Sequence, residues 1–130
     1  MTQLIDVVRT YFRAIEQGDL DALLACYWDD AIQIEWPNRL KSKGDRREIG
    51  QLSADFAKGQ ALLSSQSYDL QRFAETSDFV VVEVLWRGKL AMPVGKLAAS
   101  DEMVAHSSIA FDFNDGRIRS QRNYDCFEEF

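Results

Sequence analysis

The sequence has little of the chemistry that metal sites and disulfide-rich folds require. It contains one histidine and two cysteines, Cys26 and Cys126, which lie far apart in the chain. This set does not match the ligand spacing of a zinc site, and in a reducing compartment we expect two free, half-buried thiols. No apolar run approaches the ~18–20 residues of a membrane span, and the first residues show neither a basic leader nor a signal-peptide block. We therefore expect a cytoplasmic protein that uses no metal and no cofactor.

Positive charge is scarce as well. Fifteen basic residues stand against twenty-one acidic ones, which gives a formal net charge of −6. Nucleic acids and anionic membranes attract proteins through a concentrated positive field, so the composition argues against both partners. The nearest approach to a basic patch is a group of five residues, which we interpret as solvated surface: Arg39, Lys41, Lys43, Arg46 and Arg47.

The apolar content, by contrast, is that of an ordinary globular domain. The chain has 130 residues, of which 46% are hydrophobic, so we expect one domain over residues 1–130. Apolar residues at three- and four-residue spacing predict a first helix before Gly18: Leu4, Ile5, Val8, Phe12 and Ile15. Gly18 is a natural helix end, and Asp19 is a natural cap for a second helix.

The rest of the chain changes from helical to strand periodicity. Residues 31–36 alternate as a strand, and residues 37–44 form a polar loop. Asp45 and Glu48 have the spacing of a capping box, which predicts a third helix that ends near Gly59. Strands are expected over about 67–75, 79–90, 102–114 and 117–127, and Asp115-Gly116 is a hairpin turn. Helices followed by long antiparallel strands predict an α+β fold, a cone-shaped curved antiparallel sheet wrapped around three N-terminal helices (a cystatin-like roll) that encloses a pocket.

Short motifs in a fixed order carry a family resemblance over most of the chain. They are Tyr11 before Gly18-Asp19, then residues 27–31, 82–88, 115–118 and 123–127. In this order the chain resembles the nuclear transport factor 2-like superfamily, in particular its SnoaL-like and ketosteroid isomerase-like branch. The motifs are specific for the fold and much less so for a reaction.

The resemblance implies roles for individual residues. Glu35 is similar in position to the general base of ketosteroid isomerases, which is an aspartate there, and Tyr11 to their oxyanion-stabilising tyrosine. Ser108 falls where those enzymes have a second donor, a protonated aspartic acid, and this departure argues against steroid isomerisation. Asp125 is similar in placement to the acid or base carboxylate that SnoaL-like cyclases and epoxide hydrolase-like relatives carry on the last strand.

The geometry of the final hairpin points independently to some of the same residues. A two-residue Asp115-Gly116 loop places His106 opposite Asp125 and Ser108 opposite Asn123, with Cβ atoms about 4.5–5.5 Å apart. We predict a hydrogen bond between His106 and Asp125, a pairing suited to proton transfer near neutral pH. The polar face of the hairpin either lines the pocket, which we favour, or faces solvent, and a β-bulge would mix the two faces.

Two function hypotheses follow. The leading one is a cofactor-free acid–base enzyme of isomerase, cyclase or hydrolase type that acts on an apolar, ring-shaped substrate. Its expected catalytic residues are Asp125, His106, Glu35 and Tyr11, and its expected substrate-binding residues are Trp86, Trp36, Ser108, Asn123, Gln121 and Val82. The alternative is a non-catalytic ligand-binding or dimeric scaffold module, in which Glu35 faces solvent and Tyr11 and Trp86 are core residues. Under either hypothesis we expect a homodimer formed through the outer face of the sheet.

Overall fold

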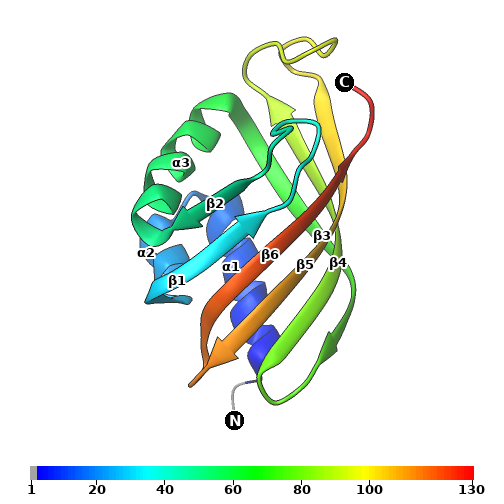
Figure 1. The fold of residues 1–130 in the computed structure, drawn as a ribbon. Coiled ribbons are helices and arrows are strands. Elements are labelled where there is room, and N and C mark those ends of the chain that lie inside the picture. The colour runs from blue at the N-terminus through cyan, green and yellow to red at the C-terminus, as the bar shows by residue number, and fades with distance from the viewer. Residues whose placement is uncertain (1–2) are drawn as a thin grey trace.

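The structure is a computed structural model that describes residues 3–130. Three helices, α1 (Leu4–Gln17), α2 (Leu20–Leu24) and α3 (Ile49–Leu62), precede or interrupt a run of strands. The strands are β1 (Tyr27–Glu35), β2 (Asp45–Glu48), β3 (Leu63–Glu75), β4 (Phe79–Leu90), β5 (Glu102–Asn114) and β6 (Arg117–Phe127). They form one sheet in the order β2-β1-β6-β5-β4-β3, and α1 lies against its inner side (Figure 1). The predicted α+β architecture is confirmed.

Local signals place the first two helices as expected. Gly18 ends α1 in the left-handed conformation, with φ of 68°, which costs glycine little. The Asp19 carboxylate caps α2 by accepting a hydrogen bond from the Ala22 amide at 3.0 Å. One face of α1 is buried, including Val8, Tyr11 and Phe12. This face packs on inward-facing side chains of the sheet such as Val82, which is 1% exposed and is a core residue instead of the predicted ligand contact.

The third helix begins later than the capping-box pattern predicts. Residues Asp45–Glu48 form the edge strand β2, paired antiparallel with Ile32–Glu35 of β1, and α3 follows with Glu48 as its N-cap. The helix then continues through Gly59 to Leu62. Backbone pairing with β1 outweighs the local helix signal here, because four residues of an edge strand gain a ladder of hydrogen bonds. The β1–β6 pairing is parallel, so the sheet is mostly antiparallel.

The last hairpin contains a β-bulge that changes which residues face inward. The predicted register holds next to the turn, where Phe113 faces Ile118, but Asp112 faces Ser120 and leaves Arg119 as an extra residue. Beyond the bulge Ser107 faces Asp125 and His106 faces Cys126, so the predicted His106–Asp125 pairing is wrong.

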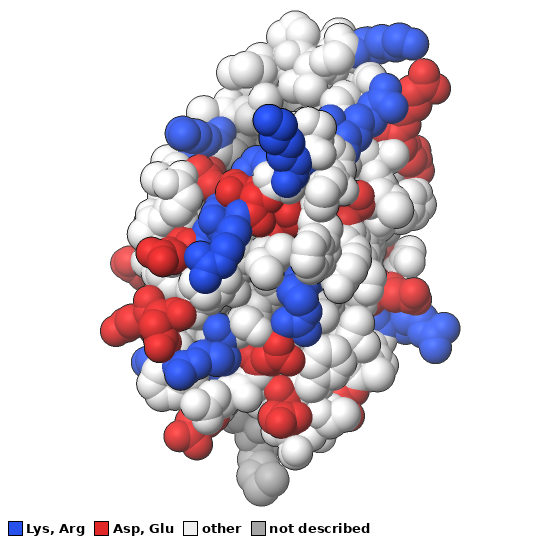
Figure 2. Space-filling model, in the orientation of Figure 1, with Lys and Arg blue, Asp and Glu red and all other residues white. Residues whose placement is uncertain are grey.

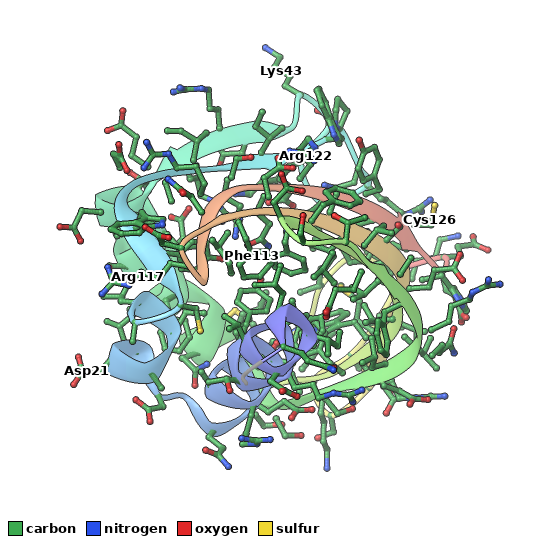
Figure 3. All side chains as sticks on the ribbon, turned by 90° about the horizontal axis from the view of Figure 1, so that it is seen from below. Asp21, Lys43, Phe113, Arg117, Arg122 and Cys126 are labelled. Atoms are coloured by element: carbon green, nitrogen blue, oxygen red, sulfur yellow. The ribbon has the colours of Figure 1, made fainter. Side chains whose placement is uncertain are left out.

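An extra residue reverses the alternation of every later side chain of β6. Gln121, Asn123 and Asp125 therefore join Phe111 and Phe113 on the inner face. Figure 3 shows Phe113 within the curve of the sheet and Arg122 and Cys126 outside it.

The surface shows no field of one sign on the side seen in Figure 2, where basic and acidic side chains alternate over β1, β2 and β6. Among the described residues no helix is long and apolar enough to cross a membrane. Both cysteines are free, as predicted. Cys26 is buried and Cys126 is exposed, so neither is half-buried.

Candidate functional site

Two adjacent chambers lie between the helices and the inner face of the sheet. A polar chamber of about 210 Å³ reaches toward β2 and α3, and an apolar chamber of about 140 Å³ lies over β4, β5 and β6. Both are lined by Tyr11, Tyr68 and Asn123, which therefore mark the junction between them. The polar chamber is named for the polar side chains that it adds, which are Gln33, Arg47, Asp55, Gln60 and Gln66; apolar side chains complete its wall, namely Ile15, Leu23, Leu52, Phe56 and Leu63. The apolar chamber adds Trp86, Ala105, Ile109 and Phe127, together with Ser107 and Asp125.

Asp125 is the carboxylate of the apolar chamber. It lies on β6, and its Oδ1 accepts a hydrogen bond from the Ser107 hydroxyl at 2.7 Å. Burial raises the pKa of Asp125 above its ordinary value; the Ser107 hydrogen bond works against this, and the nearby charge of Glu35 adds to it. A carboxylate with a raised pKa is suited to giving and taking protons near neutral pH.

Tyr11 and Asn123 provide polar groups at the junction. The Tyr11 hydroxyl and the Asn123 Oδ1 each accept a hydrogen bond from the Gln121 amide nitrogen, at 3.0 and 2.9 Å. Burial raises the pKa of the Tyr11 hydroxyl, although Gln121 and Arg47 oppose this. Tyr11 therefore keeps its proton at neutral pH and is able to donate it in a hydrogen bond.

Glu35 does not line either chamber. Its side chain, 11% exposed, accepts a hydrogen bond from Asn38 at 3.0 Å and pairs with Arg47 at 3.4 Å and Lys41 at 3.8 Å. It is neither the solvent-facing residue nor the free pocket carboxylate that the sequence suggested. Its position beside Arg47 makes it part of an ion-pair group behind the polar chamber.

Arg47 is the functional residue that sequence reasoning missed. Its side chain is 12% exposed and pairs with Glu35 and with Asp55, at 3.2 Å, which corrects its interpretation as solvated surface. It also donates to the Gln33 carbonyl oxygen. The misplaced start of α3 hid this position, because on β2 Arg47 alternates inward between the outward-facing Arg46 and Glu48. A strand assignment for residues 45–48 would have identified it.

Two predicted residues of β5 lie outside the cavity, because β5 turns its buried, mostly apolar positions such as Ile109 and Phe111 inward. His106 lies on the outer face, where its Nε2 is 2.7 Å from the Glu128 carboxylate. Ser108 lines an outer hollow of about 310 Å³ together with His106 and Tyr124, and Ser107 takes the inner position that we expected for Ser108. The reason is the alternation of β5, where neighbouring residues face opposite sides.

Of the two tryptophans that we expected to bind substrate, one lines a chamber and the other does not. Trp86 lines the apolar chamber, and its Nε1 donates to Gln66 Oε1 at 3.0 Å. Trp36 is 41% exposed and packs beside Tyr124, with ring centroids 6.2 Å apart, outside both chambers. Gln121 is fully buried behind the junction and acts on it through Tyr11 and Asn123.

Among residues 3–130 no three His, Cys, Asp or Glu side chains gather closely enough to hold a metal ion. The family model of the SnoaL-like domain matches residues 8–121 of the sequence. The chain belongs to this family. No curated protein sequence matches it.

Solved structures share the fold of this SnoaL-like domain at low sequence identity. IdmH, a candidate polyketide cyclase from Streptomyces antibioticus, is 19% identical with a TM-score of 0.80, over 95% of this chain and 92% of IdmH. An LEH-like epoxide hydrolase of M. tuberculosis is 20% identical with a TM-score of 0.69, over 96% of this chain and 82% of the hydrolase. A ketosteroid isomerase-like protein from Catenulispora acidiphila, solved with trimethylamine, is 15% identical with a TM-score of 0.73, over 92% and 84%. At such identities the likeness shows the fold alone.

Proposed function

We propose that this SnoaL-like domain is an acid–base enzyme, of isomerase, cyclase or hydrolase type, that needs no cofactor. Asp125 moves the proton, and Tyr11 and Asn123 hydrogen-bond a substrate oxygen on which negative charge develops. The substrate is small, largely apolar and ring-containing. Its ring lies in the apolar chamber against Trp86 and Phe127, and its polar end lies at the junction.

The observation that carries the proposal is the placement of Asp125 in an apolar wall. Its chamber neighbours Trp86, Ile109 and Phe127 provide little solvation, and the resulting rise in pKa fits a group that must exchange a proton during turnover. Tyr11 and Asn123 lie on the walls of the same chamber. Fixed donors aimed at a developing negative charge typically contribute about 10²–10³-fold each to the rate.

The test is Asp125→Asn, assayed on a substrate found by screening small cyclic ketones and epoxides. The amide keeps the shape and removes the proton-transferring group, so the rate should fall about 10²–10⁴-fold. Stability at neutral pH should rise at the same time. The pKa of Asp125 is raised by folding, so the carboxyl favours the folded state only at low pH and loses that contribution as pH rises through its folded pKa.

A variant with normal turnover and an unchanged fold would reject Asp125 as the proton-transferring group and leave the ligand-binding module as the account of the cavity. Glu35→Gln is the matched control. The Glu35 carboxylate is held by Lys41, Arg47 and Asn38, so its loss should lower stability more than rate.

We also propose that two copies pair through the outer face of the sheet. Aliphatic side chains of β4, such as Val81 and Leu85, share that face with Tyr124, which is 47% exposed. Light scattering at micromolar concentration should give a dimer, and Tyr124→Lys should dissociate it. Phe73→Lys is the control, because Phe73 is 44% exposed and lies under Arg9 of α1, away from that face. A monomer in the unmodified protein would contradict this proposal.

A further inference from the structure

We propose that Arg47, Gln33, Tyr27 and Gln121 form a one-way hydrogen-bond relay that turns the Tyr11 hydroxyl proton and the Asn123 amide into the cavity. The relay makes the junction a site for ligands that present an acceptor oxygen, and it disfavours ligands that present an N–H donor there. The inference rests on the proposed function only in taking the junction as the ligand site. The four relay residues are positioning residues, since they act through Tyr11 and Asn123.

The direction of the relay is set by Arg47. A guanidinium group donates hydrogen bonds and accepts none, so the Gln33 side chain must present its oxygen Oε1 to Arg47 Nη2. The orientation of the Gln33 amide is thereby fixed, and its nitrogen Nε2 faces the Tyr27 hydroxyl at 3.4 Å. The Glu35 carboxylate lies 3.4 Å from the same Nη2, and Asp55 pairs with Nη1 at 3.2 Å, which keeps the guanidinium in place.

The next two steps follow from the donor and the acceptor at each contact. The Tyr27 oxygen accepts from Gln33, and the Tyr27 hydroxyl donates to Gln121 Oε1. Gln121 then has its nitrogen Nε2 toward the junction, where it donates to the Tyr11 hydroxyl at 3.0 Å and to Asn123 Oδ1 at 2.9 Å. Tyr27 is 2% exposed and Gln121 is 0% exposed, so bulk water does not compete for these bonds.

Both N–H groups of the Gln121 amide are then hydrogen-bonded, one to the Tyr11 oxygen and one to Asn123 Oδ1. The Tyr27 hydroxyl, which also contacts Tyr11, lowers the pKa of Tyr11 as a donor to it does. Among residues 3–130 Tyr11 and Asn123 Oδ1 thus accept hydrogen bonds, and no hydrogen bond is donated by the Tyr11 hydroxyl or by Asn123 Nδ2. Both residues line both chambers. Two donors are therefore left for whatever occupies the junction. A ketone, ester or phenolate oxygen satisfies them, whereas an amine or amide N–H leaves them unpaired at a cost.

The experiment measures ligand choice and needs no turnover. The probes are 4-nitrophenol, whose absorbance shows whether it is bound as the acceptor-only phenolate, and 4-nitroaniline, which has the same ring and presents N–H donors. The unmodified protein should bind nitrophenol as the phenolate and prefer it to nitroaniline.

Gln121→Glu reverses the last step of the relay, because a carboxylate accepts from Tyr27 and Tyr11 alike and draws the Tyr11 proton away from the cavity. The preference for nitrophenolate should fall by about tenfold or more, the loss expected for one hydrogen bond to a charged acceptor. Gln33→Glu should have the same effect from a position three hydrogen bonds from Tyr11. Its carboxylate takes the Tyr27 proton, so Gln121 turns its oxygen toward Tyr11.

Gln60→Glu is the charge control, because it adds a carboxylate at an exposed position of the polar chamber, outside the relay. It should change the preference by less than about threefold. If Gln121→Glu fails to fold, Gln33→Glu still tests the relay, because its new negative charge lies beside the Arg47 guanidinium.

Two results would overturn the inference, and they differ in what else they overturn. Relay variants that match Gln60→Glu in preference would refute the relay and leave the proposed function standing. An unmodified protein that binds nitroaniline as well as nitrophenolate would refute the donor pair itself, and with it the proposed roles of Tyr11 and Asn123.

Discussion

Arg47→Met should destabilise the protein strongly, and the loss should depend on pH. The side chain is 12% exposed and joins three groups, namely Glu35, Asp55 and Gln33. Methionine fills a similar volume with no charge and no donor. The substitution therefore leaves two carboxylates, 11% and 17% exposed, without their shared cation.

The magnitude follows from the burial of the group. Removing one partner of a buried ion pair costs about 3–5 kcal/mol. The partial exposure of all three side chains favours the lower end of that range, and the lost hydrogen bond to Gln33 adds about 1 kcal/mol. With a urea dependence of about 2 kcal/mol per molar for a domain of this size, a loss of about 4 kcal/mol lowers the unfolding midpoint by about 2 M.

The pH dependence comes from Asp55. Burial opposes its ionisation, but hydrogen bonds from Gln51 and Arg47 outweigh burial and hold the pKa of Asp55 below its ordinary value. A carboxyl whose pKa is lowered by folding stabilises the native state above its unfolded pKa, about 3.9, and loses that contribution as pH falls through the folded value. The difference between the unmodified protein and the variant should therefore be full at pH 7 and shrink below about pH 4.

The assay is urea unfolding followed by circular dichroism at pH 7 and at pH 3.5–4. Arg46→Met is the control, since Arg46 is the neighbouring residue on β2 and faces outward. A midpoint shift at pH 7 no larger than that of Arg46→Met, or a shift that grows in acid, would refute the assignment of Arg47 as the cation of a buried ion-pair group.

Two further substitutions test the shape of the cavity and the orientation of the hairpin. A Cβ on Gly88 would lie 2.5 Å from the Trp86 ring, so Gly88→Ala should displace the indole. The substitution should cost about 1–3 kcal/mol of stability and weaken binding of an apolar probe. Gly50→Ala is the control: no atom lies within 4 Å of its added Cβ, so it should change neither stability nor probe binding. His106→Ala should leave stability within about 0.5 kcal/mol and leave ligand binding unchanged, because the His106–Glu128 pair is more than half exposed on the outer face. Loss of ligand binding in His106→Ala would contradict the bulged register.

The sequence predicts most of the fold because most of its signals are local. Gly18 and Asp19 mark helix ends through their own backbone preferences, and alternation marks the long strands. The bulge at Arg119 carries no comparable local signal. It is set by pairing across the sheet and by contacts such as that of Arg119 with Asp30, at 2.9 Å.

The same limit applies to the site. The family resemblance pointed to Tyr11, Asp125, Glu35 and Ser108. Tyr11 and Asp125 line the cavity, and Glu35 and Ser108 do not. The partner that turn geometry gave to Asp125 was wrong, because the extra residue Arg119 turns Asp125 to the inner face, opposite Ser107, while His106 of β5 stays on the outer face. Arg47 escaped notice because its role depends on β2 pairing with β1, a contact between segments whose local pattern favours a helix.

The most direct test of the account is the pKa of the Asp125 carboxyl, measured by NMR titration of the carboxyl carbons. Asp112 is an internal control on the same hairpin: burial opposes its ionisation, but hydrogen bonds from Arg122 and Ser120 outweigh burial and lower its pKa. The account predicts that Asp125 titrates above the ordinary aspartate value, that Asp112 titrates below it, and that Ser107→Ala raises the pKa of Asp125 further by removing its hydrogen bond. An Asp125 that titrates at or below the ordinary value would contradict its role as the proton-transferring group of the cavity.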